Sequence, residues 1–243
     1  MEGLPEAADS PNADICLQLN ADPGQGGRQA SRAVLPWSVP GMDCHYERAL
    51  PMTLHVSSQL PEDEVQRLLC ATLLPTMLQD TGALVLRGAA VDSPLGALLL
   101  VGGAMAGKST AAAALSGQGF PIISDDVIVL RLAGSEPQVA EGPEWIHLWP
   151  DGESLGRTVG DALGPVRRGL AKQRYRRPPC RGEVSRTGDR SGRRFAVAGV
   201  CVLNPSDVSR SSAVPVSAQT LLAALSDFKK TPVFPVGDRK SVV

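Results

Sequence analysis

The feature that most limits how this chain can fold is a glycine-rich loop between an apolar run and an alanine-rich run. The apolar run Ala97 to Val101 leads into Gly102-Gly103-Ala104-Met105-Ala106-Gly107-Lys108-Ser109. This loop fits the pattern of a Gly, four residues, and then Gly-Lys-Ser/Thr. The next residues, Thr110 to Ser116, have high helix propensity, and Gly117 and Gly119 supply a C-terminal stop. A strand entering such a loop and a helix leaving it predict a phosphate-binding loop.

The predicted loop suits a polyphosphate for physical reasons. Glycines let main-chain N–H groups turn inward around the anion, and the helix that starts there directs the positive end of its dipole toward it. Lys108 would reach the outer phosphates, and the Ser109 hydroxyl would complete the coordination of a magnesium ion. The simpler alternative is a turn between a buried strand and a surface helix. We expect the nucleotide to be bound by Gly102, Gly103, Ala104, Met105, Ala106, Gly107, Lys108, Ser109 and Thr110.

Two adjacent carboxylates follow the predicted helix. Phe120 to Ile123 and Val127 to Leu130 are apolar, and Ser124-Asp125-Asp126 separates them. Carboxylates at the end of a core strand are costly unless a cation or a proton-transfer role compensates them. Ligands of parallel α/β sheets gather at the carboxyl ends of strands, so we expect this pair to face the loop. One carboxylate can hold magnesium while the other accepts the proton of an attacking hydroxyl. The alternative is a pair that only caps the strand and binds water.

The order of these motifs resembles a known family. A strand, GxxxxGKS, a short helix, Gly-Gln-Gly and an apolar run ending in Ser-Asp-Asp look like the catalytic domain of bacterial HPr kinase/phosphorylase and its shorter relatives. Those relatives include serine kinases found beside lasso-peptide biosynthesis enzymes. The resemblance implies an α/β fold with a P-loop core of the HPr kinase/PEP carboxykinase type. It also implies that Asp125 is the general base, that Ser109 helps to bind magnesium, and that Asp126 supports the metal.

One position departs from the family pattern. In the family a His commonly occupies the strand position that Arg87 holds here, close to the transferred phosphate. Arg87 cannot act as a base near neutral pH, but it can stabilise phosphate charge. Arg87 is therefore expected to do electrostatic work at the catalytic site, to leave activity reduced, or to be a solvated strand-edge residue.

A basic stretch lies further along the chain. Residues 151–194 hold 12 Lys or Arg residues against 5 Asp or Glu residues. We expect a basic mobile loop here that either closes over ATP or attracts an acidic peptide, with Lys172 and Arg174 as phosphate or substrate contacts. The alternative is a solvated loop with no role at the site.

The length and composition permit one substantial core. The chain has 243 residues, of which 43% are hydrophobic, enough for a domain with a small appendage. We expect a flexible arm over residues 1–33, a small β-rich segment over 34–60 and a P-loop kinase domain over 61–243. The expected elements of the kinase domain include a helix from Pro61 to Gly82 kinked at Pro75, strands at Ala83 to Leu86 and Ala89 to Val91, a loop from Gly134 to Gly142, a strand at Arg194 to Leu203, and a helix at Ala218 to Phe228.

Charge and cysteine content exclude several classes of partner. The formal net charge is −1, which indicates no polyanionic partner and makes nucleic-acid binding a weak alternative. The five cysteines are scattered and odd in number, which argues against a disulfide framework and a zinc site. No apolar run approaches the ~20 residues that span a bilayer. We therefore expect a cytoplasmic protein with no membrane association. His147 falls on the exposed alternation of a short predicted strand and is not expected to be catalytic.

These expectations converge on an ATP- and Mg²⁺-dependent kinase that transfers the γ-phosphoryl group to a serine hydroxyl of a peptide or protein. The choice of serine, and of a lasso-type precursor peptide, comes only from the resemblance, as does a homo-oligomeric state. A GTP-binding switch is disfavoured because the Asn-Lys-x-Asp pattern is absent. The remaining alternatives are a small-molecule kinase and a catalytically weak nucleotide-binding regulatory protein.

Overall fold

The computed structural model describes two compact units of a mixed α/β protein. One unit comprises Met1–Leu73 with Pro232–Val243, and the other comprises Leu74–Thr231. Within them the structure describes residues 15–19, 34–39, 42–47, 52–58, 61, 65–66, 68–133, 136–166, 169–178, 180, 193–204 and 214–227.

The first unit contains a four-stranded sheet with the order β1-β4-β3-β2. Its strands β2, β3 and β4 form antiparallel neighbours, and β1 runs parallel to β4. Apart from β1, the arm expected over residues 1–33 lies outside the described residues. The strands of this sheet are β1 (Ile15–Leu19), β2 (Val34–Val39), β3 (Met42–Glu47) and β4 (Met52–Ser58).

The helix expected up to Gly82 is present, but the kink expected at Pro75 takes another form. A π-helix, η1 (Leu69–Leu73), leads directly into α2 (Leu74–Asp80). Pro75 has no N–H to donate to the carbonyl four residues earlier, and a wider turn just before it accommodates that missing bond. The helix ends as expected, because Gly82 has a positive φ of 83° that suits glycine.

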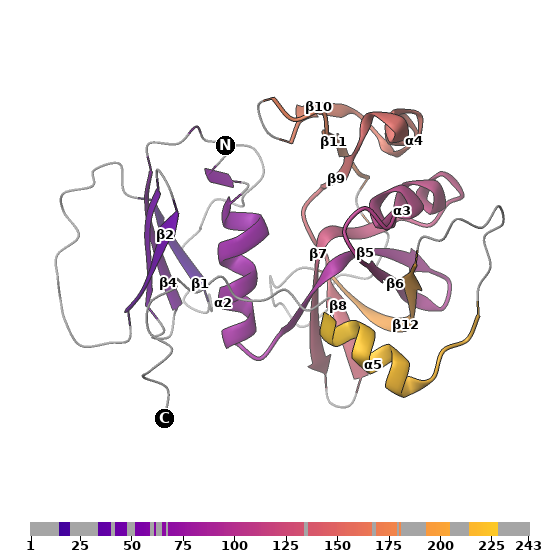
Figure 1. The fold of residues 1–243 in the computed structure, drawn as a ribbon, viewed down its shortest axis with the longest axis horizontal. Coiled ribbons are helices and arrows are strands. Elements are labelled where there is room, and N and C mark those ends of the chain that lie inside the picture. Colours follow the sequence, from indigo (N-terminus) through magenta and orange to yellow (C-terminus); the bar gives the residue numbers. More distant parts are fainter. Residues whose placement is uncertain are drawn as a thin grey trace. The chain divides into compact units, whose positions relative to one another are not determined.

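The second unit is built on a closed barrel with the strand order β12-β6-β5-β7-β8 (Figure 1). Only β12 and β6 pair in parallel; the other neighbours in the barrel are antiparallel. The sheet around the loop is therefore mixed rather than wholly parallel, which is compatible with the expected α/β class. The strands are β5 (Leu84–Ser93), β6 (Gly96–Gly102), β7 (Ile122–Ala133), β8 (Glu136–Ala140) and β12 (Arg194–Leu203).

Two expected strand boundaries differ from the structure. The two short strands expected before the loop are one continuous strand, β5, because all ten residues pair with β6 or β7. The loop expected from Gly134 to Gly142 contains β8, which bridges β7 and β12 and closes the barrel. The strand and the helix expected near the C-terminus are confirmed as β12 and as α5 (Ala218–Asp227).

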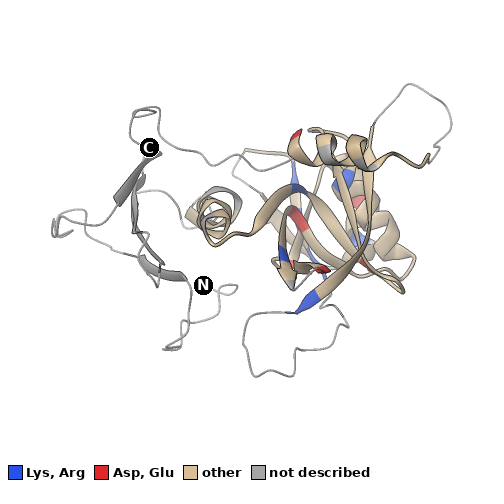
Figure 2. Ribbon diagram, turned by 90° about the horizontal axis from the view of Figure 1, so that it is seen from below, with Lys and Arg blue, Asp and Glu red and all other residues tan. Residues whose placement is uncertain are grey.

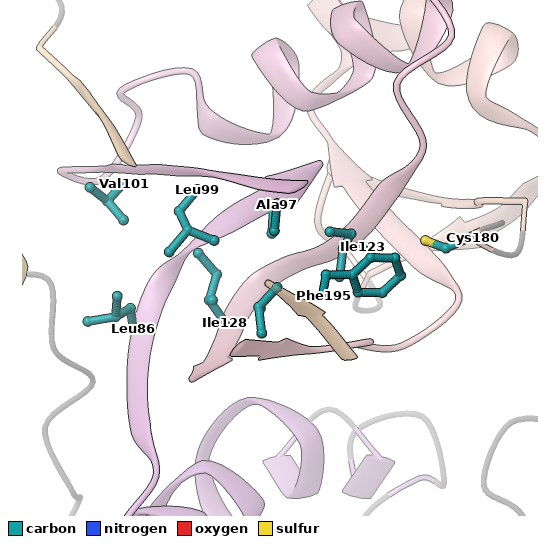
Figure 3. Packing of buried hydrophobic residues seen from close by; sticks show 10 residues of the cluster. Leu86, Ala97, Leu99, Val101, Ile123, Ile128, Cys180 and Phe195 are labelled. Carbon is teal, nitrogen blue, oxygen red and sulfur yellow. The ribbon is translucent and has the colours of Figure 1, made fainter. Parts of the chain in front are cut away.

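Apolar side chains from all five strands fill the barrel. Leu86, Leu99 and Ile128 are essentially inaccessible to solvent, and Phe195 from β12 closes the cluster (Figure 3). Each such side chain stabilises the fold by roughly 1.5–3 kcal/mol when it leaves water. Leu225 of α5 packs against the same cluster. The barrel is thus a rigid support for the residues on its outer side.

A second apolar cluster lies on the other side of β5 and β6. Ala112 and Ala113 of α3 (Lys108–Gly117) pack there with Ala89, Leu100 and Ile122. Small alanine side chains let the helix lie close to the strands, which fixes its first turn next to β7. A three-stranded sheet with the order β10-β11-β9 contributes Ile146, Leu148 and Tyr175 to this cluster.

The basic stretch is more ordered than expected. Instead of one mobile loop over residues 151–194, the first part of the stretch forms regular elements, and residues 181–192 lie outside the described chain. Tyr175 is buried and anchors this part to the core, which explains the order. The elements of this region are β9 (Trp145–Leu148), η2 (Pro150–Gly152), α4 (Glu153–Val159), β10 (Ala162–Pro165) and β11 (Gln173–Arg176).

In the part of the chain that the structure describes, no helix has the length and apolar character needed to cross a membrane.

Replacing Gly88 with alanine should destabilise the barrel. A Cβ atom at Gly88 would lie 2.5 Å from Ile128 Cδ1 and 2.6 Å from the Leu100 carbonyl oxygen. Overpacking of this kind costs about 1–3 kcal/mol. Gly199→Ala is the matched control, because the nearest atom there is 3.5 Å away, an ordinary contact. Urea unfolding of both variants tests this, and equal midpoints would contradict the packing described for the barrel.

Candidate functional site

The glycine-rich loop connects the end of β6 to the start of α3, as the sequence predicts. Gly102 must be glycine because a Cβ there would lie 2.6 Å from the Leu203 carbonyl oxygen of β12. Gly107 has φ 85°, a left-handed conformation that glycine adopts without strain. The N-terminus of α3 has no side-chain cap. Gly103, Ala104, Met105 and Gly107 are exposed, so the outer surface of the loop is open to a ligand.

Lys108 lies at the first turn of α3 and folds back over the loop. Its ammonium donates to the carbonyl oxygen of Gly102 at 3.1 Å and to that of Gly103 at 2.6 Å. Burial lowers the pKa of Lys108, and the nearby Lys172 and Arg87 lower it further, whereas Asp126 and Asp125 raise it. The ammonium is thus a half-buried cation on the loop, with both carboxylates within its electrostatic reach.

The strand register explains why the acidic pair reaches this loop. Asp125 of β7 is opposite Ala89 of β5, and Ala89 is opposite Leu100 of β6. Because β5 is antiparallel to both neighbours, β6 and β7 run in the same direction, and the acidic pair lies level with the last residues of β6. The pair was expected at the end of a strand. It instead lies within β7, beside a register irregularity.

Asp125 is the buried centre of the site. Its Oδ1 accepts the Ser109 hydroxyl at 2.7 Å, and its Oδ2 accepts the main-chain N–H of His147 at 2.9 Å. Only 7% of the residue is exposed. Burial raises the pKa of Asp125 to about 6, and Asp126 raises it too, whereas the two hydrogen bonds and Lys172 lower it. The carboxyl therefore titrates close to neutral pH, in the range that suits a general base.

Backbone strain coincides with the site. Among the described residues the non-glycine residues with positive φ are Met105, at 62°, and Asp126, at 68°. Such conformations cost roughly 1–3 kcal/mol each and cluster at functional sites. The Ser124 hydroxyl donates to the Val127 carbonyl at 2.5 Å, a bond that spans the acidic pair within β7. Asp126 is consequently exposed, while Asp125 points into the protein.

The expectation that His147 is exposed is wrong. His147 is half-buried on β9, and its main-chain N–H binds Asp125. Burial lowers the pKa of its imidazole to about 4, and the cations Lys172 and Arg174 lower it further while Asp126 raises it. The ring is therefore neutral at neutral pH. Lys172 and Arg174 were both expected to contact phosphate or substrate. The structure places them beside the acidic pair, on the side where β9 and β11 lie.

Arg87 also lies near the loop and the acidic pair. It is an exposed residue in the middle of β5, opposite Val127 of β7 and next to the Gly88–Asp126 pair. Its charge acts on Lys108. Asp125, Asp126, Arg87 and Lys172, all named from the sequence, thus act electrostatically on Lys108.

A buried arginine that sequence reasoning missed holds this arrangement together. The Arg177 guanidinium, 1% exposed, donates to the Pro143 carbonyl at 2.9 Å and the Gly142 carbonyl at 2.7 Å, and forms an ion pair with Glu141 at 3.2 Å. Gly142 in turn donates to the Ile123 carbonyl at 2.9 Å. Arg177 thus fixes the segment between β8 and β9 against β7, two residues before Asp125. In the sequence it is one cation in a basic run, with nothing to separate it from its solvated neighbours.

The oxygen atoms at the site can be compared with what a magnesium ion and a nucleoside triphosphate require. Magnesium prefers oxygen ligands, keeps several waters, and takes one or two carboxylates plus phosphate oxygens. Ser109 Oγ, Asp125 and the exposed Asp126 are oxygen donors of this kind, beside a loop whose open surface suits phosphates. No cluster of three His, Cys, Asp or Glu side chains suited to a metal occurs among the described residues. The residues fit a magnesium ion shared with phosphates, and do not form an all-protein metal cage.

Comparisons with known proteins give little support to any assignment. No protein-family model matches the chain, and no curated protein matches it either. A solved structure of the HPr(Ser) kinase/phosphatase from Coxiella burnetii is 23% identical over 26% of this chain and 43% of that chain, with a TM-score of 0.24. The chain thus spans less than half of that protein. A likeness this weak carries no argument, so the proposal below rests on the geometry of the site and, for the acceptor alone, on the resemblance of the sequence motifs.

Replacing Asp125 with asparagine should change how stability depends on pH. The folded protein holds the Asp125 proton up to about pH 6, whereas the unfolded chain releases it near 3.8. Between these values the folded state binds more protons, so the stability of the wild type falls as pH rises. The two-unit difference corresponds to ~3 kcal/mol. Asp125→Asn should lack this loss.

The measurement is urea unfolding of both proteins at pH 4 and pH 7.5, without nucleotide or divalent metal. Asp126→Asn is the control, because that carboxylate is exposed. If the difference in unfolding free energy between the wild type and Asp125→Asn is the same at both pH values, Asp125 carries no buried charge.

Proposed function

We propose that this chain is an ATP- and Mg²⁺-dependent kinase that transfers the γ-phosphoryl group to a serine hydroxyl of a peptide or protein. The observation that carries the proposal is the hydrogen bond between Ser109 and Asp125, 2.7 Å long. It joins the first turn after a glycine-rich loop to a buried carboxylate on β7, with Lys108 at the end of the same loop. In P-loop enzymes a Ser or Thr of the loop and an Asp hold the metal ion that neutralises the phosphates. Here Ser109 and Asp126 are proposed for that role, and Asp125, bonded to Ser109, is left for proton transfer.

Binding of the ATP phosphates is proposed to depend on the glycine-rich loop and on Lys108. Residues Gly102 to Thr110 would surround the phosphates with main-chain N–H groups, helped by the dipole of α3. Lys108 would leave its two carbonyl partners and neutralise the outer phosphates. Magnesium, bound by Ser109 and Asp126, would supply the remaining positive charge. Arg87, exposed and within electrostatic reach of Lys108, is proposed to stabilise charge on the transferred group.

Asp125 is proposed to be the general base. With its pKa raised to about 6, the Asp125 carboxyl is mostly ionised at neutral pH and can still accept a proton during the reaction. Asp125 would take the proton of the acceptor hydroxyl as the serine oxygen bonds to the γ-phosphorus and the bond to the bridging oxygen of ADP breaks. The Ser109 hydroxyl and the His147 N–H hold the carboxylate in place for this step. Because such transition states are loose and highly charged, placement and electrostatics would supply most of the catalysis.

The acceptor is proposed from the resemblance described above. A peptide or protein serine is expected, with a lasso-type precursor peptide as one candidate. Lys172 and Arg174 are proposed as phosphate or substrate contacts.

Asp125→Asn should lower phosphoryl transfer by roughly 10²–10⁴-fold, the usual contribution of a general base, while ATP affinity changes little. Transfer is measured with γ-labelled ATP and a degenerate peptide library with one fixed serine, and affinity with a fluorescent ATP analogue. Lys108→Ala should instead lose nucleotide affinity. Asp126→Asn should raise the magnesium concentration needed for half-maximal rate. Normal labelling by Asp125→Asn would show that another group is the base.

The same experiment separates the alternatives. Binding of ATP without labelling of any peptide, but with labelling of a small hydroxyl compound, would indicate a small-molecule kinase. Binding of ATP without turnover on any acceptor would indicate a nucleotide-dependent regulatory protein. Absence of ATP binding by the wild type would overturn the proposal altogether.

A further inference from the structure

Arg174 is a cation at the edge of the site that has no ion-pair partner among the residues the structure describes. Its side chain is half-buried, and its Nε atom is buried and has no hydrogen-bond partner among the described residues. The ion pairs that the described chain contains join Arg157 to Glu153 and Arg177 to Glu141, and so leave Arg174 out. Buried N–H groups normally have a partner, and an exception calls for an explanation such as a missing ligand. Figure 2 shows that most of the described ribbon is neither Lys or Arg nor Asp or Glu.

The strand register places Arg174 on the far side of the acidic pair from the glycine-rich loop. Asp125 turns Oδ1 toward Ser109 and the loop, and turns Oδ2 toward the His147 N–H on β9. Arg174 is the cross-strand neighbour of His147. Going outward from the loop, the order is therefore Ser109, Asp125, His147 and Arg174.

Lys172 lies between these two sides. It comes just before β11, two residues from Arg174, and its charge acts on Lys108, Asp125 and His147. The cations that act on Lys108 are Lys172 and Arg87, whereas Arg174 acts on His147. Lys108, Arg87 and the helix α3 already serve the nucleotide side. Arg174 is thus positioned for a second anion, beyond the carboxylate that receives the acceptor hydroxyl.

We propose that Arg174, assisted by Lys172, binds a carboxylate that the acceptor peptide carries next to its reactive hydroxyl. The inference rests on the proposed kinase function and specifies its substrate as an acidic peptide. An arginine fork can donate two parallel hydrogen bonds to a carboxylate, which fixes both the position and the direction of the peptide. With its acidic group held there, the peptide presents the hydroxyl to Asp125 from the side of β9 and β11.

The test uses two fluorescent peptides that differ only beside their single serine, where one has Asp and the other has Asn. The wild type should favour the Asp peptide by about tenfold or more in kcat/KM and in affinity, the effect of a hydrogen bond to a charged group. Arg174→Gln should bring this ratio close to one and leave the KM for ATP unchanged. Arg174→Lys should recover part of the ratio, because lysine keeps the charge but lacks the planar fork.

Arg176→Gln is the matched control. Arg176 is exposed, lies two residues further along the same strand and carries the same charge, but its cross-strand neighbour is Trp145 rather than His147. This variant should keep the preference for the Asp peptide. Circular dichroism of all variants checks that Tyr175, buried between the two arginines, still anchors β11.

The outcomes distinguish this inference from the kinase proposal. If Arg174→Gln weakens binding of a fluorescent ATP analogue and leaves the peptide ratio unchanged, Arg174 serves the nucleotide and the inference is overturned, while the kinase proposal stands. If the wild type fails to bind ATP or to transfer phosphate, the kinase proposal fails, and fluorescence anisotropy of the two peptides still tests the subsite. Equal affinity of the wild type for both peptides in that assay would overturn the inference.

Discussion

The hydrogen bond from Ser109 to Asp125 is the contact on which the rest of the site depends. It joins a helix that starts at a glycine-rich loop to a strand that is not adjacent to that loop's own strand. The barrel makes this possible, because β5 separates β6 from β7 and is antiparallel to both. The alanines of α3 then let the helix lie against these strands with its first turn beside Asp125. Apolar packing thus places two polar groups within 2.7 Å of each other.

The cost of burying a carboxylate is offset locally. Asp125 has a donor on each oxygen, and the cations Lys108 and Lys172 lie near it, yet its pKa remains raised because burial is the largest effect. A carboxyl in this state would gain from a bound cation, and it is also a better proton acceptor near neutral pH than an exposed aspartate. The same burial that costs stability therefore makes the group suited to the proposed chemistry. Arg177 supports this arrangement indirectly, because its guanidinium binds the carbonyls of the segment between β8 and β9 that contacts β7.

Charge is divided between two sides of the acidic pair. Lys108 and Arg87 lie on the side of the loop, and Arg174 lies by His147 on the other side. A site for transferring an anionic group between two substrates needs such a division, because each substrate must be held while the reacting atoms meet between them. The neutral His147 contributes its main-chain N–H to this arrangement without adding charge.

The local elements of the second unit could largely be predicted from the sequence. The apolar run of β6, the glycine pattern and the helix propensity of α3 are local properties, and the structure has each of them within two residues of the expected bounds. The candidate side chains Lys108, Ser109 and Asp125 were identifiable because residue type and spacing carry the chemistry. The sequence did not reveal β8 or the order within the basic stretch, since both depend on partners distant in the chain, such as β12 and the core around Tyr175.

The sequence by itself determined which groups are available: a loop that can surround an anion, a lysine, a hydroxyl and two carboxylates. Only the tertiary structure decided which of these groups are buried, which are exposed and which contact one another. The mixed strand directions, the irregularity in β7 and the left-handed Asp126 turn one carboxylate inward and leave its neighbour exposed. His147 and Arg177 acquire their roles in the same way, through contacts with residues more than 20 positions away. Residue type sets what a group can do, but burial and partners come from packing between distant segments, which no local pattern encodes.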